Sequence, residues 1–285
     1  MYENDLFVFR SGFGLEEGDT VEVKCMEGNT NIVLITKAST GKKGIYIYQT
    51  GEKIIEPIYD SIISIQVRCY DRFDNCSHGF LTYFRAILQN EIFLFDLKGN
   101  QINNYPITNK FKITEESIIL QNKKTKLYGA VDPKTYSEIF APEFKELAFG
   151  KKVYIGYKND ESNEKLYQVY SLSGVPLLKE KKKKISCCFY YFVAKSDSKI
   201  EIYSYEGKLI ISGNFINHIV IGYEYIRLKN PDGTFSLIDF SGNILLKPGI
   251  YSKIECEKEG NIINGRIIAT IKNKENANIE TFDFR

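Results

Sequence analysis

Apolar and polar residues alternate in short runs along the whole chain, and polar or glycine-containing turns separate the runs. The clearest example is Gly44–Ser61, GIYIYQTGEKIIEPIYDS. It predicts a strand, a tight turn ending at Gly51, and a second strand that reaches Pro57 just before a Tyr-Asp pair. Alternation with a period of two is typical of half-buried β-strands. Helical periodicity is almost absent, so the pattern predicts an all-β fold.

The turn in this segment recurs from one end of the chain to the other. A glycine ends every copy except one, in which Tyr136 takes the glycine position after a turn one residue longer. The turn positions are Gly12, Gly51, Gly99, Tyr136, Gly174, Gly207 and Gly242. Their spacing averages about 38 residues, which lies in the range of stacked or radial repeats. Further apolar runs before and after each hairpin predict four short strands per repeat.

About seven repeats of this length use nearly the whole chain, and the two ends are out of phase with the repeat. An aromatic strand is predicted at Leu6–Phe9, and ETFDFR at the other end matches the same part of a repeat. A ring closed by strands from both ends would leave no exposed sheet edge. We therefore expect a single domain, residues 1–285, forming a seven-bladed β-propeller closed by its N- and C-terminal strands. An open or superhelical β-repeat array is the alternative.

Two of the copies resemble the bacterial WG-type β-repeat. They are GKKGIYIYQTGEKIIEPIYDSI and KLYGAVDPKTYSEIFAPEFKEL. Both have a lysine-rich turn, a glycine before an apolar strand, a second turn, and an apolar strand with a proline. Lys43-Gly44 and Tyr128-Gly129 stand at the signature dipeptide, and the chain contains no tryptophan. The resemblance implies a scaffold or interaction module without shared catalytic residues.

Composition and charge narrow the possible partners. The 20 tyrosines and 19 phenylalanines fit half-buried β surfaces. The 38 basic and 36 acidic side chains nearly cancel, so we expect neither a nucleic-acid nor a membrane partner. No signal-peptide pattern and no apolar run of about 18 residues is present. Six cysteines without framework spacing then predict a cytoplasmic protein with reduced thiols.

The longest spacing, from Gly51 to Gly99, contains an insertion at Gln66–Gly79. Insertions in repeat proteins usually form loops on one face, often the binding face. Arginine and aromatic side chains are frequent hot spots of protein interfaces. The candidate partner-binding residues are Arg68, Tyr70, Arg72, Phe73 and His78. A surface loop without a binding role is the alternative.

The same segment raises the question of a metal site. Cys69, Cys76 and His78 are ligand types that zinc accepts. Their spacing is not a familiar zinc motif, and no second cysteine pair completes one. The prediction is therefore no metal and no cofactor.

Catalytic side chains are few and not combined into a known arrangement. The two histidines, His78 and His218, lie far apart in the sequence, and no G-x-S-x-G segment occurs. Acidic or serine residues precede most of the recurring turns, where they can accept hydrogen bonds from backbone amides. These residues are Asp96, Asp132, Ser171, Ser204, Asp239 and Asp283. We predict no catalytic residue.

These observations favour a non-enzymatic interaction module that presents surface loops to a protein partner, as a monomer or within a hetero-complex. The alternative is a carbohydrate-active hydrolase, or a carbohydrate-binding propeller with its ligand in the central channel. The basic run Lys179–Lys184 is expected to be a solvated loop rather than a phosphate site. Of the neighbouring Cys187 and Cys188, one is expected to be buried, without a disulfide between them.

Overall fold

The computed structural model describes residues 13–24, 32–70, 77–158, 164–197, 199–221, 224–259, 262–271 and 279–283. These ranges contain strands and turns and no helix, which confirms the all-β prediction for this part of the chain. None of the described residues therefore belongs to a membrane-spanning helix. Residue contacts divide the chain into two compact units, Met1–Ala148 and Phe149–Arg285. The single closed ring stays a prediction.

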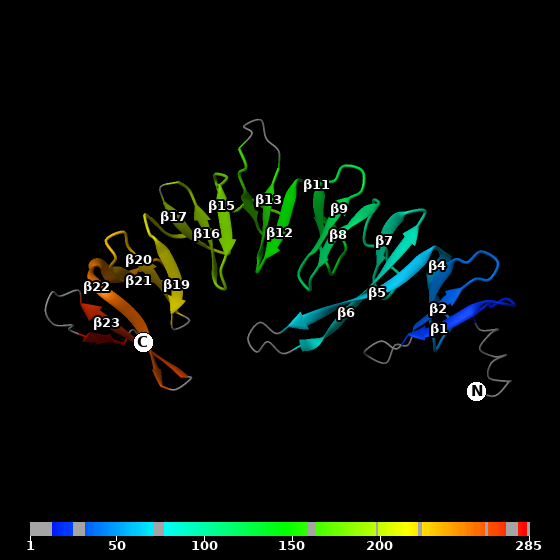
Figure 1. Ribbon diagram of the computed structural model, residues 1–285, viewed down its shortest axis with the longest axis horizontal. Helices are drawn as coiled ribbons and strands as arrows, with labels where there is room; N and C mark the ends of the chain where they lie inside the picture. Colours follow the sequence, from blue (N-terminus) through cyan, green and yellow to red (C-terminus); the bar gives the residue numbers. More distant parts are fainter. Residues whose placement is uncertain are drawn as a thin grey trace. The chain divides into compact units, whose positions relative to one another are not determined.

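The first unit contains two antiparallel sheets (Figure 1). The four-stranded sheet is made of β1 (Thr20–Lys24), β2 (Ile32–Thr36), β3 (Lys43–Ile47) and β4 (Lys53–Tyr59). The seven-stranded sheet is made of β5 (Ser61–Tyr70), β6 (Ser77–Leu88), β7 (Glu91–Phe95), β8 (Ile107–Ile113), β9 (Ile118–Asn122), β10 (Tyr128–Val131) and β11 (Glu138–Phe144). In this second sheet β7 and β8 pair only at Ile92 and Ile107. It therefore consists of two consecutive strand sets, β5–β7 and β8–β11.

The remaining sheets belong to the second unit, apart from the first residues of β12. The three-stranded sheet is made of β12 (Glu146–Gly150), β13 (Val153–Tyr157) and β14 (Gln168–Tyr170). The four-stranded sheet is made of β15 (Lys184–Cys187), β16 (Tyr191–Lys195), β17 (Ile200–Ser204) and β18 (Leu209–Gly213). The six-stranded sheet is made of β19 (Asn217–Ile221), β20 (Tyr225–Lys229), β21 (Phe235–Asp239), β22 (Ile244–Glu259), β23 (Ile262–Ile271) and β24 (Ile279–Phe282). The long β22 pairs with β21 near its start and with β23 further on.

The recurring turn is present at each predicted position within the described ranges. It follows the third strand of a set, and its last residue adopts positive φ. The φ values are 71° at Gly51, 82° at Gly99, 82° at Gly174, 85° at Gly207 and 93° at Gly242. Tyr136, at the position predicted for the missing glycine, also has positive φ, 57°. Gly12 lies outside the described residues.

A fourth strand comes after Gly51, Tyr136, Gly207 and Gly242. After Gly99 and Gly174 there are only isolated bridged residues, such as Gln101 and Pro176, so the prediction of four strands per repeat was wrong for these two sets.

The glycines of the two WG-like copies have a steric cause. A Cβ atom on Gly44 would lie 2.7 Å from the Ile55 carbonyl oxygen, and one on Gly129 would lie 2.6 Å from that of Phe140. Both glycines face an irregular register in the adjacent fourth strand, at the place where that strand contains a proline. β4 and β11 continue through these prolines, and each is the last strand in the order of its sheet. A bulged edge strand accepts a proline because its missing N–H is not needed there.

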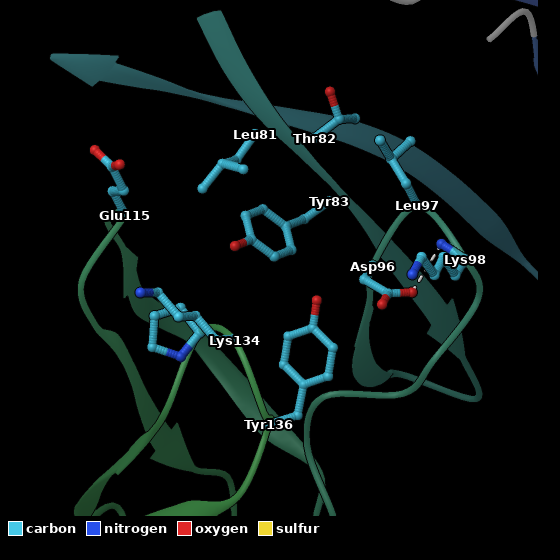
Figure 2. Close-up of a pocket in the computed structure, with 10 residues that line it drawn as sticks. Leu81, Thr82, Tyr83, Asp96, Leu97, Lys98, Glu115, Lys134 and Tyr136 are labelled. Atoms are coloured by element: carbon cyan, nitrogen blue, oxygen red, sulfur yellow. Dashed lines mark hydrogen bonds between the residues drawn. The ribbon is translucent and has the colours of Figure 1, made fainter. Parts of the chain in front are cut away.

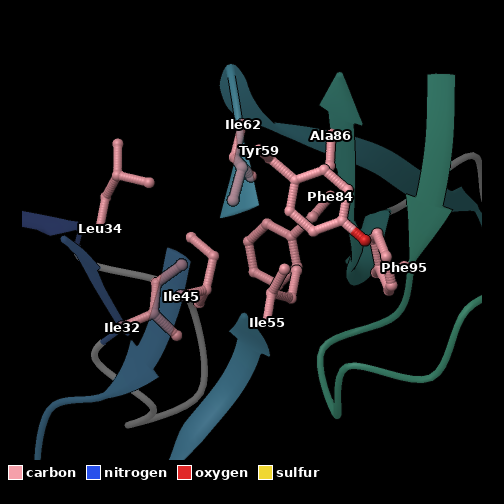
Figure 3. Packing of buried hydrophobic residues seen from close by; sticks show 9 residues of the cluster. All are labelled: Ile32, Leu34, Ile45, Ile55, Tyr59, Ile62, Phe84, Ala86 and Phe95. Atoms are coloured by element: carbon pink, nitrogen blue, oxygen red, sulfur yellow. The ribbon is translucent and has the colours of Figure 1, made fainter. Parts of the chain in front are cut away.

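Hydrophobic clusters fill the space between consecutive strand sets. In the cluster between the first sheet and β5–β7, aliphatic residues from β2–β4 meet aromatic residues from β6 and β7 (Figure 3). The ring centroids of Tyr59 and Phe95 lie 5.6 Å apart in an edge-on arrangement. Equivalent alternating positions supply the clusters further along the chain. The period-two pattern thus places one face of each strand against a neighbouring sheet.

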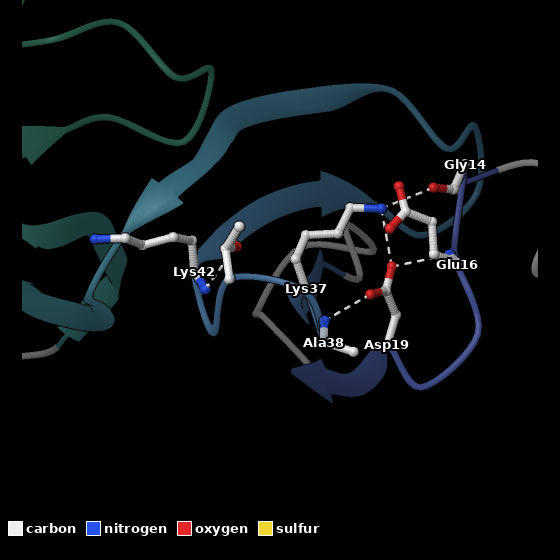
Figure 4. A network of polar contacts seen from close by, with 7 residues as sticks. Gly14, Glu16, Asp19, Lys37, Ala38 and Lys42 are labelled. Atoms are coloured by element: carbon white, nitrogen blue, oxygen red, sulfur yellow. Dashed lines mark hydrogen bonds and ion pairs between the residues drawn. The ribbon is translucent and has the colours of Figure 1, made fainter.

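A polar network holds the first described residues against the β2–β3 turn (Figure 4). The Lys37 ammonium donates to the Gly14 carbonyl at 2.9 Å and to the Asp19 carboxylate at 2.8 Å. The Ala38 amide donates to the same carboxylate at 2.8 Å. Burial opposes ionisation of Asp19, but the hydrogen bond from Lys37 and those from the backbone outweigh it and lower the pKa of Asp19.

Candidate functional site

The predicted binding segment lies at the far end of the hairpin formed by β5 and β6. Their pairing runs from Ser61 and Ile87 to Tyr70 and Ser77. The prediction of a loop over Gln66–Gly79 was therefore wrong for residues 66–70 and 77–79, which belong to paired strands. The apolar alternation of the hairpin continues through Val67, so pairing in the same register extends into the insertion.

The structure places only part of the predicted site. Arg68 pairs with Phe80, and Tyr70 pairs with Ser77. His78 lies in β6, one residue further along. The side chains of these three residues, and all of Arg72 and Phe73, lie outside what the structure describes. Their role in binding stays a prediction.

A metal site receives no further support from the described residues, in which no group of three His, Cys, Asp or Glu side chains could hold an ion. Cys76 lies outside these residues. The other histidine, His218, has its Nδ1 atom 3.0 Å from the Tyr191 hydroxyl oxygen. Burial, followed by the charge of Lys195, lowers the pKa of His218. This half-buried imidazole has an ordinary packing role against an aromatic ring.

A hollow of 350 Å³ lies in the first unit, between the strand sets β5–β7 and β8–β11 (Figure 2). β6, the turn after β7, the β8–β9 turn and the β10–β11 turn all contribute to its lining. Its residues are Leu81, Thr82, Tyr83, Asp96, Leu97, Lys98, Glu115, Pro133, Lys134 and Tyr136. Tyr83 and Asp96 are buried, whereas the two lysines and Glu115 are exposed. The hollow therefore has a mainly apolar interior and a charged margin.

Asp96 is the buried acidic residue that lines this hollow, and its carboxylate accepts hydrogen bonds from its own turn. Its Oδ1 atom accepts hydrogen bonds from the backbone amides of Lys98 and Asn100, each at 2.8 Å. Its Oδ2 atom accepts one from the Asn100 side-chain amide, also at 2.8 Å. The Tyr136 hydroxyl is directed toward the space between Tyr83 and Asp96 (Figure 2). Burial raises the pKa of Tyr136, and the charge of Asp96 and its hydrogen bond with the hydroxyl raise it further.

The same capping occurs at the other turns, as predicted. Asp239 accepts from the amides of Ser241 and Asn243, each at 2.8 Å, and Asp132 accepts from that of Thr135 at 2.8 Å. The hydroxyls of Ser171 and Ser204 accept one amide each in their own turns. Asp283 is followed by residues outside the described ranges. Turn formation therefore accounts for these side chains without a catalytic role.

The position of the hollow follows from the turn residues. A Cβ atom on Gly99 would lie 2.1 Å from the Ile54 carbonyl oxygen, and one on Gly242 would lie 2.3 Å from that of Ile210. In both cases the turn glycine lies against the fourth strand of the preceding set, β4 or β18. Tyr136 occupies the corresponding position in the β10–β11 turn, and its ring lines the hollow. The cavity thus lies at the described turn in which the glycine is replaced.

Of the residues that line the hollow, only Asp96 and Tyr136 stand out in the sequence, and both do so as turn residues. Tyr83, Leu97 and Lys134 do not stand out, because nothing local in the sequence brings these positions together. The signal that was available is the tyrosine at a position where the other described copies have glycine.

The basic run is not uniformly solvated. Lys182 is buried, and its ammonium lies 2.8 Å from the Glu201 carboxylate, which Lys199 also contacts at 2.8 Å. Burial opposes ionisation of Glu201, but the hydrogen bonds from Lys182 and Lys199 outweigh it and lower the pKa of Glu201. The prediction of a solvated loop was therefore wrong at Lys182, which stabilises the second unit.

The two adjacent cysteines are both free and both half-buried, so the prediction that one of them is buried was wrong. They pack against different hydrophobic clusters, but only Cys187 lies in β15, and Cys188 directly follows this strand. Burial raises the pKa of Cys187 to about 11. A thiol with a raised pKa is a poor nucleophile at neutral pH.

Comparisons with known proteins add little to this picture. No protein-family model and no curated protein matches the chain. Kluyveromyces lactis Hsv2 is 12% identical over 91% of this chain and 93% of its own, with a TM-score of 0.31. The WD40 β-propeller domain of Doa1 is 16% identical over 71% and 79%, with a TM-score of 0.23. PorZ of Porphyromonas gingivalis is 9% identical over 89% and 37%, with a TM-score of 0.30. At these TM-scores the likeness assigns neither fold nor function.

Proposed function

We propose that the chain is a non-enzymatic β-repeat interaction module that binds a protein partner through the β5–β6 hairpin. The observation that carries the proposal is the length of this hairpin. β5 has 10 residues and β6 has 12, whereas the other strands of the first unit have four to seven. The excess length contains the predicted binding segment.

The hairpin has features suited to recognition. β5 is the last strand in the order of its sheet, so among the described strands it has a neighbour on one side only, and edge strands can pair with a strand of another chain. Ile63 and Leu81 are 49% and 36% exposed, which places large apolar side chains at the surface of the hairpin. The arginine and tyrosine residues of its outer half are types that dominate binding energy at interfaces.

The scaffold in this proposal is a seven-bladed β-propeller closed by the N- and C-terminal strands. Consecutive antiparallel sets of similar length support it, as does β22, which passes without interruption from one set to the next. β24 is the last strand in the order of its sheet, so among the described strands it has a neighbour on one side only, as closure by a further strand requires. A rigid ring of repeats would hold the hairpin in a fixed orientation.

The test is quantitative affinity capture from the native cell with the full chain and a shortened variant. Val67 and Leu81 are paired, so residues 68–80 can be replaced by Asn-Gly, which favours a tight hairpin turn. We expect partner recovery to fall by at least about tenfold, because the hot-spot residues are removed, while the melting temperature changes little. Arg68→Ala and Tyr70→Ala would each give a smaller loss.

The control is the other long hairpin, between β22 and β23. Cys256 and Ile267 are paired there, so residues 257–266 can be replaced by the same Asn-Gly turn. This variant should retain the partner. Undiminished capture by the β5–β6 variant, or loss of capture only in the β22–β23 variant, would refute recognition through β5 and β6.

A further inference from the structure

We infer that the hollow between the strand sets β5–β7 and β8–β11 receives an apolar side chain, aromatic or long aliphatic, from the bound protein partner. The inference rests on the proposed function, because it assigns the hollow to the same partner as the hairpin. The two features share β6, whose residues Leu81 and Tyr83 line the hollow.

The lining selects an apolar group. Leu81, Leu97, Pro133 and the rings of Tyr83 and Tyr136 form most of the interior. The volume, 350 Å³, lies near the lower end of the range for small-molecule sites, so the hollow has room for a large side chain. Leu81 and Leu97 are 36% and 38% exposed, so an apolar group that enters the hollow would remove their surface from water.

The polar groups inside the hollow disfavour a sugar. Asp96 already accepts three hydrogen bonds from its own turn. A carbohydrate would therefore find this carboxylate occupied, and each hydroxyl buried without a partner would cost about 1–3 kcal/mol. A sugar can still contact the margin, so the experiment includes one.

The charges at the margin disfavour a purely ionic ligand. Lys98 and Lys134 lie there together with Glu115, and all three side chains are exposed. Charges of both signs select neither an acidic nor a basic group. They form a polar edge around an apolar centre, which is the usual arrangement of a side-chain pocket at a protein interface.

The hollow also lies next to the predicted recognition segment along one strand. Leu81 pairs with Val67, and the adjacent pair in the hairpin is Arg68 with Phe80. A partner segment bound along the outer half of the hairpin could therefore place one of its side chains at Leu81. This adjacency is the reason for assigning the hollow to a protein partner rather than to a free small molecule.

The direct test uses small probes on the full chain. N-acetyl-L-phenylalaninamide serves as the apolar side-chain probe and methyl β-D-glucopyranoside as the sugar probe, with leucine methyl signals followed by NMR. We expect the amide to shift the Leu81 and Leu97 methyl signals in a saturable manner with a Kd on the order of 1 mM, as few contacts are made. The sugar should leave them unchanged.

The matched variants are Leu97→Glu and Leu172→Glu. Both leucines follow the capping residue of the recurring turn, and they are 38% and 47% exposed, but Leu172 does not line the hollow. Leu97→Glu should weaken amide binding at least tenfold, and Leu172→Glu should not change it. Shifts caused only by the sugar, shifts caused by neither probe, or equal effects of the two variants would overturn the inference.

Partner capture separates this inference from the proposed function. Leu97→Glu should lower partner recovery about tenfold, the fold-change expected for a hot spot of about 1.4 kcal/mol. If capture requires the hairpin but is unaffected by Leu97→Glu, the inference fails and the proposed function stands. If capture requires Leu97 but is unaffected by shortening the hairpin, recognition by the hairpin fails and the hollow is retained as the binding site.

Discussion

The first unit contains two junctions between consecutive strand sets, and they differ in how closely the sets approach. At the junction between the first sheet and β5–β7, Gly99 lies directly against the Ile54 backbone, and aliphatic and aromatic side chains fill the space. The junction between β5–β7 and β8–β11 also has a hydrophobic cluster, but Tyr136 takes the glycine position and a hollow is present beside it. One turn residue thus separates a closed junction from an open one.

The difference shows that the recurring glycine has two physical roles. Positive φ alone does not require it, because Tyr136 adopts φ 57° in the same kind of turn. Close approach of backbone atoms does require it, because any Cβ atom on Gly99 would overlap the Ile54 carbonyl. A larger residue is tolerated only where the neighbouring set leaves room, and that room is the candidate binding site.

The largest expected effect is that of Gly99→Ala at the closed junction. The new Cβ atom would overlap the backbone of β4, so the sets must separate, at a cost of roughly 3 kcal/mol of unfolding free energy. Gly233→Ala is the control, because Gly233 has nearly the same φ, 81° against 82°, but nothing within 4 Å of its Cβ position. That variant should lose about 1 kcal/mol.

Urea unfolding of both glycine variants gives the comparison. Equal losses at Gly99 and Gly233 would mean that backbone conformation, rather than close approach, explains the recurring glycine. The midpoints should be compared along with the slopes, since two units can unfold in separate steps.

The next effect is that of Asp96→Ala compared with Asp239→Ala. Both carboxylates cap a turn through the same pattern of amide hydrogen bonds, but Asp96 also lies near the hydroxyl of Tyr136 (Figure 2). We expect Asp96→Ala to lower the free energy of unfolding by about 3 kcal/mol. Asp239→Ala should lower it by about 2 kcal/mol. Urea unfolding measures the difference, and Tyr136→Phe should remove most of it. A larger loss at Asp239 would contradict the role of Asp96 at the open junction.

At the open junction itself, glycine should be better tolerated than alanine. Tyr136→Gly and Tyr136→Ala both lose the ring, but only alanine keeps the cost of positive φ. The glycine variant should therefore be more stable than the alanine variant by about 1 kcal/mol. Glycine is also expected to be more stable than alanine at position 99. The difference in unfolding free energy between glycine and alanine should be smaller at position 136, because no neighbouring backbone atom has to move there. Thermal or urea unfolding of the two variants is sufficient, and a gap as large as that at Gly99 would indicate a closed junction.

The smallest effect is the pH dependence of the Asp239 turn. Burial opposes ionisation of Asp239, but the hydrogen bonds from Asn243, Ser241 and Gly242 outweigh it and lower the pKa of Asp239. A lowered folded-state pKa stabilises the protein above the unfolded value, about 3.9, and this contribution is lost as pH falls through the folded value. The stability difference between wild type and Asp239→Asn should thus be constant from pH 7 to about pH 5 and vanish in stronger acid. Unfolding midpoints at pH 7, 5 and 3 test this, and a difference that grows in acid would contradict it.

The features that could be predicted from the sequence are local and repeated. The turn glycines, the capping role of Asp96 and Asp239, and the unusual Tyr136 turn follow from residue types at a fixed position in each repeat. The errors concern burial. Lys182 looked like part of a solvated basic run, yet it is buried and forms an ion pair with Glu201 of β17. The insertion looked like a loop, because its polar residues masked the continued pairing of β5 and β6.

The sequence by itself determined the all-β class, the repeat and the position of its recurring turns, because strand alternation and turn chemistry act between residues close together in the chain. Only the tertiary structure decided which consecutive sets pack tightly and which leave a hollow. That outcome depends on the distance between a turn and the preceding sheet, as at Gly99 and Ile54. The hollow is lined by residues from four separate turns and strands, and no single segment of the sequence contains them.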